Sequence, residues 1–134
     1  MIGLDTNVLV RLLTGDDPAQ QQLAAAYIEK SCSTEDPAYI NRIVLIEFVW
    51  VLESVYKYSR PQIAEALVRM LRTAELRFED HEAAWAAATA YRNGVDFADF
   101  VIVCTNEKAG CRATATFDVR AAKQLPGVEV IREL

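Results

Sequence analysis

The sequence has a single histidine, His81, and this scarcity limits the chemistry that the protein can perform. Serine and cysteine hydrolases, and nucleases that cleave with paired histidines, all place an imidazole at the reacting atoms. His81 lies in a charged run, from Glu79 to Glu82, that is typical of the exposed beginning of a helix. We therefore expect any catalytic chemistry to depend on carboxylates.

Cysteine is also scarce, and its three positions, Cys32, Cys104 and Cys111, match no spacing known for zinc sites. An odd number of cysteines is not the pattern of a disulfide framework either. We predict that the three side chains are thiols in a reducing cytoplasm and pack as small, buried apolar groups.

Long apolar runs are missing too. The longest, from Ile43 to Leu52, is interrupted by Glu47 and falls short of the roughly 20 residues that a membrane-spanning helix needs. Asp5 and Asn7 occur where a signal peptide would be basic and then apolar. We therefore expect a cytoplasmic protein.

Basic residues are outnumbered by acidic ones, which gives a formal net charge of -5. Proteins that hold nucleic acid through bulk electrostatic attraction usually have a basic surface, so the charge argues against that class. It does not argue against a nuclease in which metal ions and a local group of arginines offset an acidic pocket.

The pattern of apolar residues predicts short strands that alternate with helices. A chain of 134 residues fits one domain, residues 1–134, with a full core. Such alternation is typical of an α/β fold, in which a mostly parallel central sheet is layered between helices by right-handed crossovers. The predicted strands are 1–4, 38–40, 75–79, 113–117 and 128–131, and the predicted helices are 8–13, 19–31, 42–56, 61–73, 83–92, 100–109 and 119–124.

Acidic residues follow two of the predicted strands. Asp5 ends the first strand and Asp118 ends the fourth, so both should face the crevice at the carboxyl edge of a parallel sheet. Asp99, at the beginning of a helix, can reach the same crevice. Glu47 lies within an apolar helix, where an unpartnered carboxylate would be desolvated and would need a cation or a hydrogen-bond donor.

These four acids would repel one another unless a divalent cation neutralised them. Oxygen ligands without histidine or thiolate favour the hard ions Mg²⁺ or Mn²⁺ over zinc. The sequence therefore predicts a magnesium or manganese site.

Each acid also has an ordinary structural explanation. Asp5, Asp99 and Asp118 could cap the helices that follow them, and Asp96 could be a turn residue. Glu47 could pair with Arg42 or Arg112, and Thr6 and Thr116 could be simple cap and strand residues. None of the acids is specific by itself, whereas the whole set in this order is.

The ordered set resembles the PIN-domain ribonucleases, specifically the VapC-type toxins of bacterial type II toxin–antitoxin systems. The resemblance extends from Ile2-Gly3-Leu4-Asp5-Thr6-Asn7, through Glu47, to Asp96-Phe97-Ala98-Asp99 and Thr116-Phe117-Asp118. Phe100 departs from it, since the family usually has a small residue there.

This resemblance implies a PIN-like three-layer fold and a Mg²⁺-dependent endoribonuclease toxin, with Mn²⁺ as a possible substitute. It implies an RNA substrate, a cognate antitoxin that occludes the site, a toxin homodimer and a toxin–antitoxin hetero-oligomer. The implied catalytic residues are Asp5, Glu47, Asp99 and Asp118, the implied metal ligands are Asp5, Asp99 and Asp118, and the implied supporting residues are Thr6, Asn7, Asp96 and Thr116.

Three alternatives compete with this interpretation. A phosphatase of the haloacid dehalogenase type also begins with an aspartate after its first strand, but a second aspartate usually stands where this chain has Asn7. A catalytically inactive PIN-like domain would bind RNA or a partner, although it would have no reason to retain a repulsive set of acids. A receiver-type signalling domain would require adjacent acids after the first strand.

Overall fold

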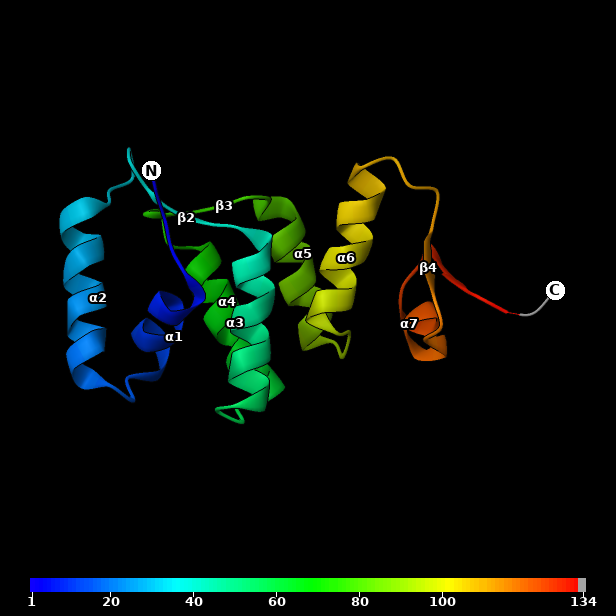
Figure 1. Ribbon diagram of the computed structural model, residues 1–134, viewed down its shortest axis with the longest axis horizontal. Coiled ribbons are helices and arrows are strands. Elements are labelled where there is room, and N and C mark those ends of the chain that lie inside the picture. The colour runs from blue at the N-terminus through cyan, green and yellow to red at the C-terminus, as the bar shows by residue number, and fades with distance from the viewer. Residues whose placement is uncertain (133–134) are drawn as a thin grey trace.

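The computed structural model describes residues 1–132 and confirms the α/β fold (Figure 1). All strand pairs are parallel, and helices connect them. The strands are β1 Ile2–Gly3, β2 Ala38–Ile40, β3 Leu76–Phe78, β4 Thr114–Thr116 and β5 Val128–Val130. The helices are α1 Thr6–Thr14, α2 Pro18–Ser31, α3 Arg42–Ser54, α4 Arg60–Leu71, α5 His81–Arg92, α6 Phe97–Lys108 and α7 Val119–Gln124.

Local sequence signals explain where the helices begin and end. Gly15 adopts a left-handed conformation, with a φ of 63°, and terminates α1. Asn41 accepts a hydrogen bond from the Val44 amide at 2.9 Å and caps α3. Ser59 and Gln62 form a reciprocal capping box at the beginning of α4. The predicted elements agree with the observed ones to within a few residues, because capping residues mark most of their ends.

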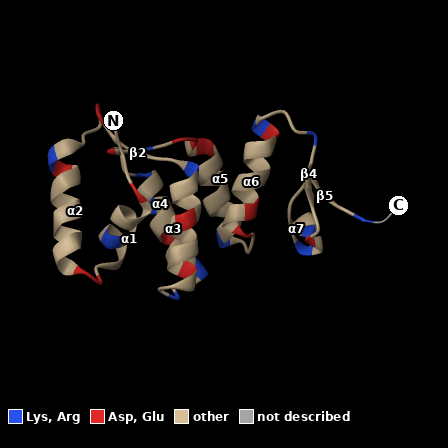
Figure 2. Cartoon of the chain, in the orientation of Figure 1, with Lys and Arg blue, Asp and Glu red and all other residues tan. Residues whose placement is uncertain are grey.

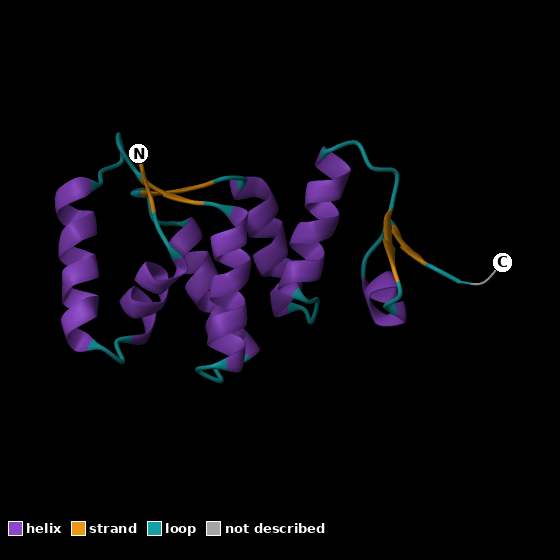
Figure 3. Ribbon diagram, in the orientation of Figure 1, coloured by secondary structure: helices purple, strands orange, loops and turns teal. Residues whose placement is uncertain are grey.

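The strands form two separate sheets rather than one. One sheet has the order β1-β2-β3, and the other pairs β4 with β5 (Figure 3). β1 and β4 are therefore both edge strands within the described residues, and Asp5 and Asp118 end strands of different sheets. The prediction that a single sheet would bring these two acids to one crevice is not met, because β1, with only two residues, pairs on one side alone.

The main core lies among α3, α4, α5 and α6, beneath β2. Phe48, Leu52, Ile63, Tyr91 and Phe97 are among its largest fully buried side chains. The unit formed by β4, α7 and β5 lies beyond α6, at the end of the molecule opposite α2 (Figure 1). Asn106 of α6 is hydrogen-bonded to Thr114 of β4 at 3.0 Å, so this unit is attached to the outer side of α6.

Two expectations about burial were wrong. One face of α3 is open, with Ile43 and Trp50 exposed to 72% and 60%, and Glu47 is exposed between them. Glu47 is therefore not desolvated, because it lies on the side of α3 that turns away from the core. Cys111 is also exposed, whereas Cys32 and Cys104 are partly buried. None of the helices in residues 1–132 is long and apolar enough to cross a membrane.

Candidate metal centre

Three of the predicted acids line one open hollow. Asp96 and Asp99 come from the beginning of α6, and Asp118 comes from the turn between β4 and α7. The hollow has a volume of about 180 Å³ and is bordered by two arginines, Arg60 and Arg120. It forms where the β4–α7–β5 unit meets the beginning of α6. Figure 2 marks the acidic positions of the chain, including those on α6, in red.

The beginning of α6 leaves the Asp99 carboxylate free of protein donors. Asp96, rather than Asp99, caps the helix, because its Oδ1 accepts the amide hydrogen of Asp99 at 2.9 Å. Among residues 1–132, no hydrogen-bond donor contacts the side chain of Asp99. The alternative of Asp99 as a helix cap is thus wrong, and its carboxylate oxygens are available to a ligand.

Asp118 combines a structural role with an available oxygen atom. Its Oδ1 accepts hydrogen bonds from the amides of Arg120, at 2.9 Å, and Ala121, at 3.3 Å, and so caps α7. Its own amide donates to the Thr116 hydroxyl at 3.0 Å, which fixes the turn. Capping uses one oxygen of a carboxylate and leaves the other free, so it does not compete with metal binding.

The pKa of the Asp99 carboxyl is raised above its ordinary value. Burial is the main cause, and the negative charges of Asp96 and Asp118 raise the pKa further. Asp99 is thus close enough to Asp96 and Asp118 to be repelled by their charges, and a cation in the hollow would relieve that repulsion.

A network of buried groups holds the turn that precedes Asp96. The Arg60 guanidinium donates to the backbone oxygens of Tyr91, at 2.8 Å, and Val95, at 3.1 Å, and lies over the Tyr91 ring. The Tyr91 hydroxyl in turn donates to Glu53 of α3 at 2.9 Å. Burial and the nearby Glu53 carboxylate raise the pKa of Tyr91, which therefore stays protonated as a donor. Arg60 and Tyr91 thereby fix the position of Asp96.

Glu47 lies in a neighbouring groove and not in the hollow itself. This groove is lined by apolar residues of α3, including Ile43, Ile46 and Trp50, and by Asp96 at its border with the hollow. Asp96 therefore connects the two depressions. No ion pair links Glu47 to Arg42 or Arg112 in the described chain; Arg42 instead pairs with Glu79 at 2.9 Å.

The structure does not bring the first-strand residues into the hollow. Asp5 is exposed and caps α1, with its Oδ1 accepting from the Thr6 amide at 2.8 Å. Thr6 is buried, and Asn7 lines a separate groove between α1 and α2. Across residues 1–132, no three acidic, histidine or cysteine side chains form a ready metal-binding group.

Sequence reasoning did not identify Arg60 or Arg120 as residues of the site. Arg60 precedes the predicted helix 61–73, and Arg120 lies within the predicted short helix 119–124. One signal for Arg120 was its position two residues after Asp118, where a long side chain at the beginning of a helix can reach back toward the acid. No sequence signal marks Arg60, because its guanidinium donates to the backbone oxygens of Tyr91 and Val95, which any residue type would provide.

The raised pKa predicts how stability depends on pH in the absence of metal. A carboxyl with a higher pKa in the folded protein than in the unfolded chain stabilises the fold in acid, and this contribution is lost as the pH rises through the folded-state value. Asp99→Asn should therefore raise the melting temperature of the metal-free protein at neutral pH, and the gain should shrink toward pH of about 3.5. Thermal unfolding in a chelator measures this effect.

The matched control is Glu129→Gln, which removes the same charge from an exposed position on β5. An equal gain for both variants, or a gain for Asp99→Asn that persists unchanged in acid, would contradict the assignment of repulsion to the hollow.

The sequence pattern of the PIN-domain family matches residues 2–126 of the chain. Searches of curated proteins and of solved structures gave no match to the chain.

Proposed function

Because the chain belongs to the PIN-domain family, whose members are generally metal-dependent nucleases, we propose that it is a Mg²⁺-dependent endoribonuclease. The observation that carries this proposal is the hollow in which Asp96, Asp99 and Asp118 gather without histidine or thiolate. Carboxylate oxygens are the ligands that Mg²⁺ and Mn²⁺ prefer. Burial, and then the charges of Asp96 and Asp118, raise the pKa of Asp99, and a divalent cation would offset both effects.

Asp99 and Asp118 would be direct metal ligands in this proposal. Asp99 has both carboxylate oxygens free, and Asp118 has one free beside its capping bonds. Their side chains would have to close on the cation, since no ready metal-binding group exists in the described chain. A bound Mg²⁺ would supply positive charge to the phosphate that is attacked.

The remaining acids would support the reaction from the two sides of the hollow. Asp96 would offer the cation its Oδ2, the oxygen that does not cap α6. Glu47, in the adjoining groove, would accept a hydrogen bond from the attacking water and orient it. We also propose Asp5 as a ligand, with Thr6, Asn7 and Thr116 in support. This requires the end of β1 to approach the β4–α7–β5 unit, which pairs with no strand of the first sheet in residues 1–132.

The direct test is incubation of the purified protein, free of partners, with structured RNAs in Mg²⁺, in Mn²⁺ and in a chelator. The proposal expects internal cleavage that needs a divalent cation and stops when the cation is removed. Intact RNA under all conditions, or cleavage that a chelator does not affect, would contradict it. A parallel incubation with DNA separates a ribonuclease from a general nuclease.

We further propose that this nuclease is the VapC-type toxin of a type II toxin–antitoxin module and acts as a single domain in the cytoplasm. The open face of α3 supports a protein partner, because exposed Ile43 and Trp50 flank Glu47 beside the acidic hollow. A cognate antitoxin with an apolar helix and a basic side chain would complement this groove. The same face would also serve a homodimer, whereas the apolar residues of α4 are largely occupied by the core.

The toxin assignment predicts that induced expression of the chain arrests bacterial growth. Asp99→Asn should abolish the arrest at an equal protein level, and Glu129→Gln should not. Counts of colony-forming cells after induction, with immunoblots for protein level, measure the effect. Arrest by Asp99→Asn as strong as that by the wild type would contradict a toxin that acts by cleavage.

A further inference from the structure

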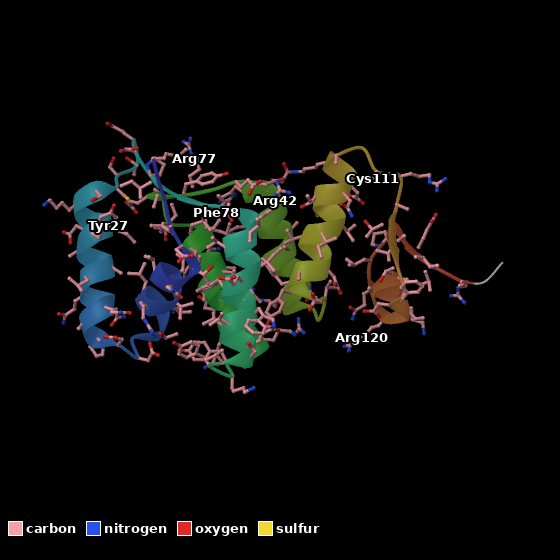
Figure 4. The ribbon with its side chains drawn as sticks, in the orientation of Figure 1. Tyr27, Arg42, Arg77, Phe78, Cys111 and Arg120 are labelled. Carbon is pink, nitrogen blue, oxygen red and sulfur yellow. The ribbon has the colours of Figure 1, made fainter. Side chains whose placement is uncertain are left out.

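We propose that Arg120 binds a backbone phosphate of the RNA at the edge of the acidic hollow. The proposal rests on the proposed ribonuclease function and adds a substrate-binding residue to it. Arg120 borders the same hollow as Asp99 and Asp118. It lies in the first turn of α7, and its long side chain is exposed. Figure 4 shows Arg120 at the end of the β4–α7–β5 unit that lies beside α6.

The backbone of Arg120 is fixed relative to the acid that it would serve. Its amide donates to Asp118 Oδ1 at 2.9 Å, so Arg120 cannot move away without breaking the cap of α7. A phosphate held by the guanidinium of Arg120 would therefore lie within the reach of one arginine side chain from the Asp118 carboxylate. Keeping the substrate near the reacting groups in this way is how a binding residue helps to position a scissile phosphodiester.

The guanidinium of Arg120 is uncommitted. Within residues 1–132, no carboxylate lies within ion-pair distance of it, and its side chain donates no hydrogen bond to the protein. Arg60, the other arginine of the hollow, donates from its Nη1 to the backbone oxygens of Tyr91 and Val95 and lies over the Tyr91 ring. The two arginines thus have different roles, since Arg60 holds the protein together and Arg120 is available to a ligand.

The negative charge of the hollow explains why a positively charged side chain is needed to bind a phosphate at its edge. The chain has a formal net charge of -5, and three carboxylates line the hollow, so an approaching phosphate backbone is repelled. A metal ion would neutralise the centre of the hollow but not its edge. A guanidinium at the edge can hold a phosphate by two parallel hydrogen bonds, a geometry that lysine cannot provide.

The competing explanation is that Arg120 serves as an internal counter-ion for the acids. In that case its removal would increase the repulsion around Asp99 and would lower the stability of the metal-free protein. The phosphate-binding role predicts no such loss. The melting temperature of Arg120→Ala without RNA and without metal therefore separates the two roles.

The decisive experiment measures RNA binding in the Asp99→Asn background, in which cleavage does not interfere. Fluorescence anisotropy with single-stranded RNA oligonucleotides of several sequences compares Arg120→Ala, Arg120→Lys and Lys123→Ala. Lys123 is exposed on the same helix but does not border the hollow, so it is a matched control. Each measurement is repeated over a series of salt concentrations.

We expect Arg120→Ala to weaken binding about tenfold for every sequence and to reduce the slope of log affinity against log salt by about one phosphate contact. Lys123→Ala should change binding by less than about twofold, and Arg120→Lys should restore the salt slope but only part of the affinity. With active protein, Arg120→Ala should raise KM more than it lowers kcat.

The proposal is overturned if Arg120→Ala and Lys123→Ala bind alike, if the loss depends on base sequence, or if no RNA binds. It is also overturned if Arg120→Ala lowers the melting temperature without RNA. These results are independent of the nuclease test. A wild-type protein that fails to cleave RNA would refute the proposed function, whereas the comparison of RNA binding would still decide the role of Arg120.

Discussion

Asp99→Asn should lower metal-dependent RNA cleavage by at least about 100-fold, since changes even in residues that merely support a metal ligand cost tenfold to 100-fold. Of the three acids that line the hollow, Asp99 has no capping role, and burial together with the charges of Asp96 and Asp118 raises the pKa of its carboxyl. Asparagine keeps the size of the side chain but removes the charge and one oxygen. Initial cleavage rates in saturating Mg²⁺ measure the loss.

Asp118→Asn refines this prediction, because asparagine caps a helix about as well as aspartate does. The cap of α7 should persist in this variant, and any loss of cleavage then reports on the carboxylate rather than on the fold. Glu129→Gln again serves as the control and should cleave as the wild type does. Rates for Asp99→Asn and Asp118→Asn that match the control would contradict the proposed metal ligands.

Phe48→Ala should reduce the free energy of unfolding by about 3–5 kcal/mol. Phe48 is fully buried among the core helices, so truncation both removes apolar burial and leaves a cavity. Trp50, two residues further along α3, is 60% exposed, and Trp50→Ala should cost less than about 1 kcal/mol. Urea unfolding followed by circular dichroism compares the two variants.

This pair also tests which face of α3 is open. A large loss for Trp50→Ala in the isolated protein would mean that Trp50 is packed, and it would remove the main support for a partner site on α3. A small loss for Phe48→Ala would contradict the position of the core itself.

Most elements of the fold could be predicted from local signals. The caps Asp17, Asn41 and Ser59, together with Gly15, mark helix ends through their own side chains or backbone conformation, and these effects do not depend on the rest of the chain. The separation of β4 and β5 from the first sheet could not be predicted in the same way. Strand pairing depends on which edges meet in space, and no residue within a two-residue strand such as β1 encodes its neighbours.

The candidate site was predictable in part for the same reason. Asp99 lies in the first turn of α6, and Asp118 caps α7. Capping patterns reveal the beginnings of helices in the sequence, so both positions could be predicted. The burial of Glu47 was predicted wrongly because its nearest neighbours in the sequence are all apolar. In a helix, however, the residues three or four positions away share a face with Glu47. Ile43, Glu47 and Trp50 share one face of α3, and that face is open.

Binding of Mn²⁺, followed by the electron paramagnetic resonance signal of the free ion, tests the central claim that the hollow holds a divalent cation. Mn²⁺ accepts the same oxygen ligands as Mg²⁺ and can be measured directly without RNA. We predict that the wild-type protein and Glu129→Gln bind Mn²⁺ with similar affinity and that Asp99→Asn and Asp118→Asn bind it at least about tenfold more weakly. Equal binding by all four proteins, or no binding by the wild type, would contradict the assignment of Asp99 and Asp118 as metal ligands.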